Sequence, residues 1–227
     1  MRIIVGMGGG IAAYKAAMLL RLFAKNGDEV IAMPTPNATK FVGVPTLEAL
    51  SGNPVSTDVF ERVPEVNHVR QAEQADAVVI APATADLLAR LAAGHADDLL
   101  SATVLTTHAP VILAPAMHTQ MWENPATRAN VQTLRSWGYH VIEPAIGRLP
   151  GLRPRPYART RGHLPPGAGG YCAVPEAFYA PGVHARLRPD PAPVRRYGAG
   201  ARGRRTPGDP GLDEYRRSWR PRGRRGR

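Results

Sequence analysis

Short apolar runs alternate with longer amphipathic segments along the first two thirds of the chain. The apolar runs have strand length and contain many β-branched residues, and they predict strands at Arg2–Gly6, Glu29–Met33, Ala77–Ala81, Val111–Ala114 and His140–Ile142. The segments between them carry apolar residues at helical spacing, and they predict helices at Ile11–Lys25, before Ser51-Gly52, and at Val66–Gln74, Ala85–Ala93, Asp97–Thr106 and Pro125–Trp137.

The predicted strands Ala77–Ala81 and Val111–Ala114 are apolar throughout, rather than on alternate residues. Strands of this kind, alternating with helices, are typical of a parallel sheet that is covered on both faces. We therefore predict an α/β fold with a doubly wound parallel sheet in three layers, like flavodoxin. Such sheets bind ligands at the carboxyl ends of their strands, so the loops after each strand are the candidates for chemistry.

The composition of the chain changes after Leu149. Residues 1–147 have a net charge of −3, whereas residues 148–227 have a net charge of +14 and contain 19 Arg but no Lys. Residues 150–227 also lack Ile, Met, Asn and Gln, and consist largely of Arg, Gly, Pro and Ala. We predict one domain at 1–149 and a disordered or poorly packed tail at 150–227. The preference for residues with GC-rich codons suggests a shifted reading frame as the origin of the tail.

The remaining composition excludes several classes of protein. The single cysteine, Cys172, excludes a disulfide framework and a multi-cysteine metal site, which agrees with a reducing cytoplasm. No apolar run reaches about 18 residues, so we expect no membrane span, and the N-terminus does not resemble a secretory signal. The basic tail would attract nucleic acid, but it contains no recognisable binding module, which disfavours that function.

The first loop to inspect is a glycine turn between a predicted strand and a predicted helix, formed by Gly8, Gly9, Gly10 and Ile11. Glycines at this place let backbone N–H groups approach a phosphate at the N-terminus of the helix. The dinucleotide fingerprint also requires an acidic residue at the end of the second strand, where this chain has Met33-Pro34-Thr35. The turn therefore indicates a mononucleotide phosphate, with a plain tight turn as the alternative.

Two further loops follow predicted strands, and one histidine stands apart from them. The first loop contains Pro82, Ala83, Thr84, Ala85 and Asp86, of which Thr84 and Asp86 could simply cap the next helix. The second contains Ala116, Met117, His118, Met121 and Trp122, where Met and Trp could simply be core residues. His68 has a side chain suited to proton transfer, although an isolated histidine is more often structural or solvated.

Taken together, these loops resemble the flavoprotein family of Cys decarboxylases, and within it the branch that acts in coenzyme A synthesis. The resemblance extends from Ile3 to about Leu149. The matching motifs are Gly9–Lys15, Thr35–Val42, Leu47–Val55, His68, Ala81–Asp86, Gly94–Leu100, Pro115–Trp122, Asn124–Thr127 and Glu143–Leu149.

The resemblance implies that FMN is held by the glycine turn, by the loop of Thr35 and Phe41, and by the 82–86 loop. It implies that His68 is catalytic and that Ala116, Met117, His118 and Met121 receive the substrate, 4′-phosphopantothenoylcysteine. In the family, FMN takes a hydride from the cysteinyl Cβ, CO₂ leaves, and reduction of the enethiolate gives 4′-phosphopantetheine. The resemblance also implies a homotrimer or a multiple of it, with FMN at a subunit boundary.

The chain departs from the family pattern at three places. Gly8 stands where the family often has Ser or Thr, and His118 stands where many members have Asn. After Leu149 the substrate flap of the family is absent, and Cys172 lacks the neighbours expected of the proton donor in that flap, so we give it no such role. An inactive FMN-binding subunit therefore stays open as an alternative, as do a flavin prenyltransferase and a peptidyl-cysteine decarboxylase.

Overall fold

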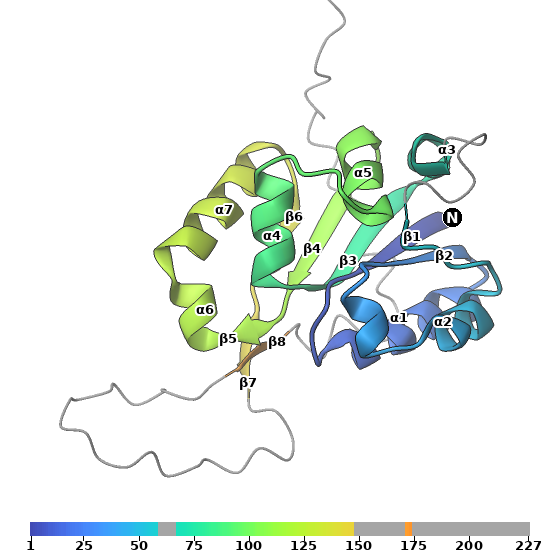
Figure 1. Ribbon diagram of the computed structural model, residues 1–227, viewed down its shortest axis with the longest axis horizontal. Coiled ribbons are helices and arrows are strands. Elements are labelled where there is room, and N and C mark those ends of the chain that lie inside the picture. The colour runs from blue at the N-terminus through green and yellow to red at the C-terminus, as the bar shows by residue number, and fades with distance from the viewer. Residues whose placement is uncertain (59–66, 148–170, 174–227) are drawn as a thin grey trace, which may run out of the picture. The chain divides into compact units, whose positions relative to one another are not determined.

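A computed structural model of the protein describes residues 1–58, 67–147 and 171–173. Its centre is a parallel sheet with the strand order β2-β1-β3-β4-β6 (Figure 1). These strands are β1 (Arg2–Met7), β2 (Glu29–Pro34), β3 (Ala77–Ala83), β4 (Val111–Pro115) and β6 (His140–Val141). Because the chain starts in the middle of the sheet and extends it in both directions, the loops after β1 and β3 lie side by side at its carboxyl edge.

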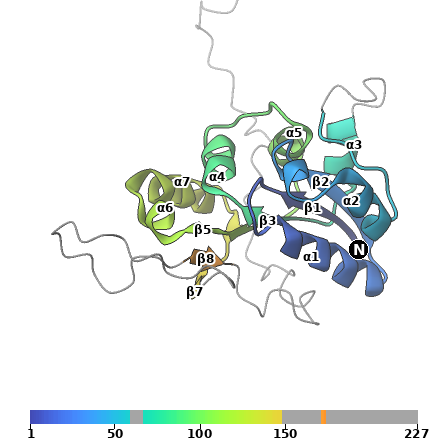
Figure 2. The ribbon, with the colours of Figure 1, turned by 60° about the horizontal axis from the view of Figure 1, so that its bottom comes forward.

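Helices cover both faces of this sheet, which explains why its central strands are apolar on every residue. Helix α1 (Ala13–Lys25) and helix α2 (Val44–Ser51) cover one face, where Phe23 and Leu47 pack on Val5 and its neighbours. Helices α4 (Ala85–Ala92), α5 (Leu99–Thr106) and α7 (Pro125–Ser136) cover the other face. Figure 2 shows α1 and the pair α4 and α5 on opposite sides of the strands. The three-layer, doubly wound α/β fold predicted from the sequence is confirmed.

The short elements complete this arrangement. A 3-10 turn, η1 (Ala38–Lys40), follows β2, and α3 (Asn67–Gln74) packs against α5 just before β3. Helix α6 (Thr119–Glu123) leads directly into α7. None of the helices in the described part of the chain is long and apolar enough to cross a membrane.

A second, antiparallel sheet was not predicted from the sequence. It has the strand order β5-β8-β7 and consists of β5 (Met117–His118), β7 (Ala145–Gly147) and β8 (Tyr171–Ala173). In its register, Cys172 lies opposite both Met117 and Ile146. Strand β8 belongs to the segment for which we predicted no ordered structure, so at these residues the structure differs from that prediction. The rest of 150–227 lies outside the described residues, and the domain boundary at 149 stays a prediction.

The predicted boundaries shift where a capping or pairing interaction decides them. Helix α5 begins at Leu99 because Asp98 is its N-cap: the Asp98 carboxylate accepts from the Ser101 backbone N–H at 2.8 Å. Strand β3 continues to Ala83, which pairs with Pro115 of β4 after a shift in register. The end of helix α1 does not shift: it lies at Lys25 as predicted, followed by Asn26 and by Gly27 with a φ of +83°.

Candidate functional site

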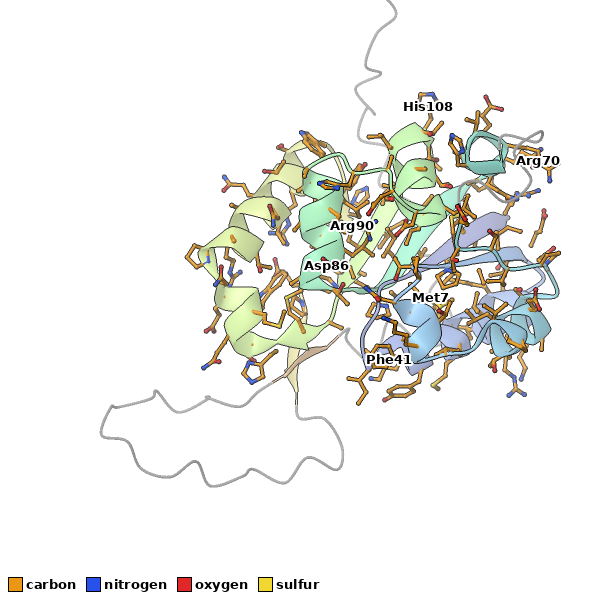
Figure 3. All side chains as sticks on the ribbon, in the orientation of Figure 1. Met7, Phe41, Arg70, Asp86, Arg90 and His108 are labelled. Carbon is orange, nitrogen blue, oxygen red and sulfur yellow. The ribbon has the colours of Figure 1, made fainter. Side chains whose placement is uncertain are left out.

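A cavity of about 680 Å³ lies at the carboxyl edge of the parallel sheet. It brings together most of the residues that the sequence predicted for the site. Those that line it are Gly8, Gly9, Gly10, Thr35, Phe41, Thr84, Ala85, Asp86, Ala116, Met117, His118 and Met121. Figure 3 shows Met7, Phe41 and Asp86 around this edge, contributed by three different parts of the chain. The three loops that follow β1, β3 and β4 therefore form one site.

The glycine turn has no room for side chains. The Gly8 N–H donates to the Pro82 carbonyl at 2.9 Å, and a Cβ on Gly8 would stand 2.7 Å from the same oxygen. A Cβ on Gly9 would stand 2.5 Å from the Cβ of Asn37, and one on Gly10 would stand 3.3 Å from Cγ2 of Thr84. The turn thus lies in close contact with the loops after β2 and β3, with bare backbone at the start of α1. This arrangement suits an anion that binds backbone N–H groups.

The loop after β2 forms a second wall of the cavity. The buried Thr35 donates its backbone N–H to the Met7 carbonyl at 2.9 Å, and its Oγ1 accepts from the Ala38 N–H at 3.3 Å. The Lys40 ammonium donates to Oδ1 of Asn37 at 2.9 Å. Lys40 and Asn37 both line the cavity, although the sequence prediction did not include them. The ring of Phe41 is exposed beside them.

The loops after β3 and β4 combine structural roles with a place in the site. Thr84 caps α4 by accepting from the Leu87 N–H at 3.3 Å, so the capping alternative is correct, and Thr84 still lines the cavity. His118 likewise caps α6, because its Nδ1 accepts from the Gln120 N–H at 3.2 Å. Trp122 is buried under the Arg128 guanidinium, 5.0 Å from its ring centroid, so the core interpretation holds for Trp122. Met121, in contrast, is exposed and lines the cavity.

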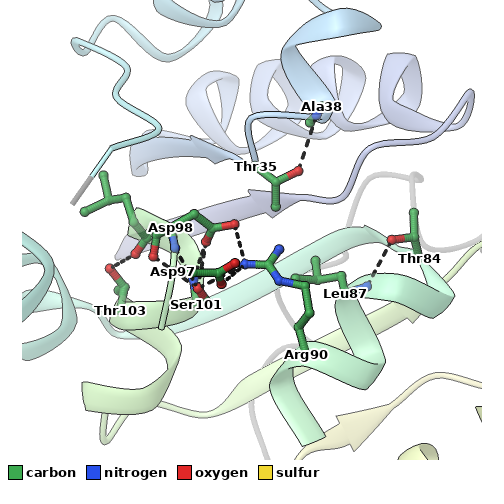
Figure 4. A network of polar contacts seen from close by, with 10 residues as sticks. Thr35, Ala38, Thr84, Leu87, Arg90, Asp97, Asp98, Ser101 and Thr103 are labelled. Carbon is green, nitrogen blue, oxygen red and sulfur yellow. Dashed lines mark hydrogen bonds and ion pairs between the residues drawn. The ribbon is translucent and has the colours of Figure 1, made fainter. Parts of the chain in front are cut away.

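An ion-pair cluster forms a third wall that the sequence prediction missed. Arg90 of α4 reaches Asp97 and Asp98, which lie just before α5 (Figure 4). Its Nη2 donates to Oδ2 of Asp98 at 2.9 Å, and Ser101 Oγ lies 3.4 Å from the same nitrogen. The Asp98 side chain is only 4% exposed, whereas that of Asp97 is 62% exposed. All three charged residues line the cavity.

Arg90 and Asp97 stay charged at neutral pH. Although burial opposes the charge of Arg90, hydrogen bonds to Asp97 and Asp98 outweigh that effect and raise the pKa of its guanidinium. The hydrogen bond from Arg90 lowers the pKa of the Asp97 carboxyl, against the smaller effect of desolvation. Asp97 is therefore a carboxylate, and an acceptor, throughout the neutral range.

Four predicted site residues do not line the cavity. Pro82 and Ala83 are buried within β3, and Ile11 is exposed at the start of α1. His68 lies in the first turn of α3 and is not among the residues that line the cavity. Figure 3 shows the same separation, since Arg70 of α3 lies far from Phe41 and Asp86. The Nδ1 of His68 is buried and has no hydrogen-bond partner among the described residues.

Comparison with known proteins fits this geometry. The sequence model of the flavoprotein family matches residues 1–151, which is more than half of the chain. The chain belongs to the flavoprotein family. Among curated members, the coenzyme A biosynthesis bifunctional protein CoaBC of Mycolicibacterium smegmatis is 62% identical over 150 residues. That match covers 66% of this chain and 36% of the relative, so the chain spans about a third of the length of such relatives.

Solved structures of related proteins have a similar fold. The FMN-dependent cysteine decarboxylase SpaF is 35% identical, with a TM-score of 0.60 over 63% of this chain and 84% of its own. A mutant PPC decarboxylase complexed with pantothenoylaminoethenethiol is 28% identical, with a TM-score of 0.66 over 82% of this chain and 96% of its own.

We predict that Asp98 is the most stabilising member of the ion-pair cluster. In Asp98→Ala, helix α5 loses its N-cap and Arg90 loses its buried partner, so we expect the free energy of unfolding to fall by roughly 2–4 kcal/mol. Asp97→Ala removes an exposed partner, and we expect a change of about 1 kcal/mol or less. Urea unfolding of both variants at neutral pH makes the comparison, and equal losses would contradict it.

Proposed function

We propose that the chain binds FMN in the cavity at the carboxyl edge of the sheet and catalyses the decarboxylation of 4′-phosphopantothenoylcysteine. The observation that carries the proposal is the convergence of three loops on one cavity in a member of the flavoprotein family. Two of its relatives support the chemistry: CoaBC proteins are named for coenzyme A biosynthesis, and one structural neighbour is named a PPC decarboxylase.

The residues present fit a flavin mononucleotide. The glycine turn lines the cavity with backbone at the positive N-terminus of α1, where a phosphate is favoured, and its close contacts with Pro82 and Asn37 leave no space for side chains. Arg90 also lines the cavity, and its buried Nε has no partner among the described residues, so the residue has a donor to offer a ligand. A volume of about 680 Å³ lies within the usual range for a cofactor pocket.

FMN, when bound, supplies a reversible acceptor for the hydride of the cysteinyl Cβ. The protein has to hold the ring and the substrate against each other and to manage protons. Phe41 and Met121 offer exposed apolar surface at the rim of the cavity for the ring or the substrate. His118 lines the cavity with its Nδ1 already engaged by the Gln120 N–H, so its Nε2 is the atom that can meet a polar group of the substrate.

We propose that the working unit is a homotrimer or a multiple of it. If His68 acts in catalysis, we expect it to come from a neighbouring subunit, because it does not line the cavity of its own chain and Arg70 on the same helix lies far from Asp86 (Figure 3). The exposed side chains of Tyr14 and Met18 on α1 and of Ile11 just before it form an apolar stripe next to the glycine turn. Such a stripe is the kind of surface that a neighbouring subunit covers.

An inactive FMN-binding subunit is the second candidate, because the segment after Leu149 does not continue the family pattern. The pairing of β8 with β5 counts against it, since it sets Cys172 opposite Met117 at the edge of the cavity. A part of the tail therefore occupies a place from which a flap could act.

The test is a paired measurement on the purified full-length chain. We expect a flavin absorbance spectrum, and release of CO₂ from 4′-phosphopantothenoylcysteine in an anaerobic assay. A flavin spectrum with no CO₂ release would favour the inactive subunit. CO₂ release from a peptide with a C-terminal cysteine, but not from the phosphorylated substrate, would move the chain to the peptidyl-cysteine decarboxylases.

A further inference from the structure

The guanidinium of Arg90 is engaged on one side only. Every hydrogen bond to a neighbouring residue that the structure gives it, to Asp97, Asp98 and Ser101, is made through Nη2. Its Nε is shielded from solvent and has no partner among the described residues. An unpaired buried donor costs about 1–3 kcal/mol, so an acceptor is expected next to it.

The carboxylate that holds Arg90 is itself held by several hydrogen bonds. The Asp98 carboxylate accepts from both the backbone N–H and the hydroxyl of Ser101, at 2.8 and 2.9 Å, and it is buried. Figure 4 shows the guanidinium between these carboxylates on one side and Thr84 on the other, with Thr35 nearby. Arg90 lines the same cavity as Thr35 and Thr84, so the unpaired nitrogen belongs to a residue of the site.

The charge of the cluster limits what it can bind. Arg90, Asp97 and Asp98 together carry a net charge of −1, which disfavours a phosphate or a carboxylate at this end of the cavity. Asp97 is largely exposed, lines the cavity and stays ionised, so it remains an acceptor for a donor on the ligand. The wall therefore presents a donor and an acceptor side by side to an uncharged group.

The imide edge of a flavin has the complementary pattern, because its N3–H donor stands between two carbonyl acceptors. We propose that Arg90 and Asp97 recognise this edge, with Arg90 donating to a ring carbonyl and Asp97 accepting from N3–H. The inference rests on the proposed binding of FMN and adds to it the orientation of the ring: phosphate at the glycine turn, pyrimidine side at the ion-pair cluster. Asp98 is a positioning residue that holds Arg90 in place.

The test compares FMN with 3-methyl-FMN, in which the N3–H is replaced by a methyl group. We expect the apoprotein of the full chain to bind 3-methyl-FMN about 10- to 100-fold more weakly than FMN, as measured by quenching of flavin fluorescence. In Asp97→Ala, FMN affinity should fall by about the same factor while affinity for the analogue changes little, so the discrimination disappears. Arg90→Lys, which keeps the charge but lacks Nε–H, should weaken both flavins.

The control is Glu143→Ala. Glu143 forms an exposed ion pair with Arg135, as Asp97 does with Arg90, but neither residue lines the cavity. It should leave both affinities unchanged. The midpoint potential of bound FMN gives a second measurement. Because Asp97→Ala removes a negative charge next to the flavin, it favours the reduced anionic form and should raise the potential by about 30 mV. This shift is equivalent to a tenfold change in the affinity for reduced relative to oxidised FMN. Glu143→Ala should not shift it.

The outcomes separate the inference from the proposed function. Discrimination that persists in a folded Asp97→Ala, as judged by circular dichroism, would overturn the assignment of Asp97 while FMN binding stood. Equal affinity of the wild type for both flavins would overturn it as well. If the wild type bound neither flavin, the proposed function would fail, and the inference with it.

Discussion

Gly9→Ala should abolish the retention of flavin by the purified protein. The added Cβ would stand 2.5 Å from Cβ and 2.8 Å from the carbonyl carbon of Asn37, so the glycine turn or the loop after β2 has to move. Either movement displaces the backbone N–H groups that are proposed to bind the phosphate. Since a hydrogen bond to a charged group contributes about 1.5–3 kcal/mol, losing two should weaken FMN binding by at least 100-fold.

A matched substitution separates this effect from a general cost of replacing glycine. In Gly43→Ala, the nearest atom to the new Cβ is Cδ of Pro45 at 3.7 Å, and the backbone φ of −65° suits any residue. We expect this variant to retain FMN as the wild type does. Gly10→Ala, with a contact of 3.3 Å to Thr84, should lie between the two. Equal FMN content in Gly9→Ala and Gly43→Ala, measured from the absorbance of purified protein, would refute the phosphate assignment.

Overpacking of the turn should also appear in stability. Inserting a methyl group into a contact this close typically costs about 1–3 kcal/mol, which is measurable by urea unfolding of the apoproteins. The loss of FMN should exceed what this destabilisation explains, because the folded fraction of Gly9→Ala stays high. Circular dichroism of the variant confirms whether it is folded.

The elements that surround this turn could be predicted from the sequence because their signals are local. Strands β1, β3 and β4 are continuous apolar runs, and α1 ends at an Asn-Gly pair, so pattern and turn residues agree at each place. The site residues of the three loops followed from one further rule, that parallel strands gather their carboxyl ends at one edge.

The ion-pair cluster could not be predicted in the same way. Asp97 and Asp98 are seven and eight residues from Arg90 and lie beyond the end of its helix. Helical spacing therefore does not predict that they contact Arg90. They meet because Gly94, with a φ of +72°, ends α4 and reverses the chain, so the next residues fold back against α4. A glycine followed by two acids was visible in the sequence, but the direction of the reversal was not.

Strand β8 and the place of His68 were missed for a related reason. Both depend on pairing between residues far apart in the chain, such as Cys172 with Met117, and local patterns carry no information about such partners. Periodicity predicted a helix around His68 correctly, but it could not tell whether the histidine would line the cavity. The separation of His68 from the cavity is therefore a result of the structure alone.

That separation leads to the second large expected effect. If His68 transfers a proton during decarboxylation, His68→Asn should retain FMN, because His68 does not line the cavity, and should lose activity by about 10²- to 10⁴-fold. Retained activity in His68→Asn would remove the histidine from the mechanism. Loss of FMN together with activity would indicate a structural role instead.

A mixture of two inactive variants decides from which subunit His68 acts. Gly9→Ala keeps His68 but lacks a functional cavity, whereas His68→Asn keeps the cavity. Suppose that each site combines the cavity of one subunit with the His68 of its neighbour. In an equal mixture, the cavity is intact in about half of the sites and the neighbour carries His68 in about half, so randomly mixed oligomers regain about a quarter of the wild-type activity. If His68 reached the cavity of its own subunit, every site in the mixture would lack one component and the mixture would stay inactive. Because no subunit in the mixture carries both an intact glycine turn and His68, restored CO₂ release can come only from sites shared between subunits.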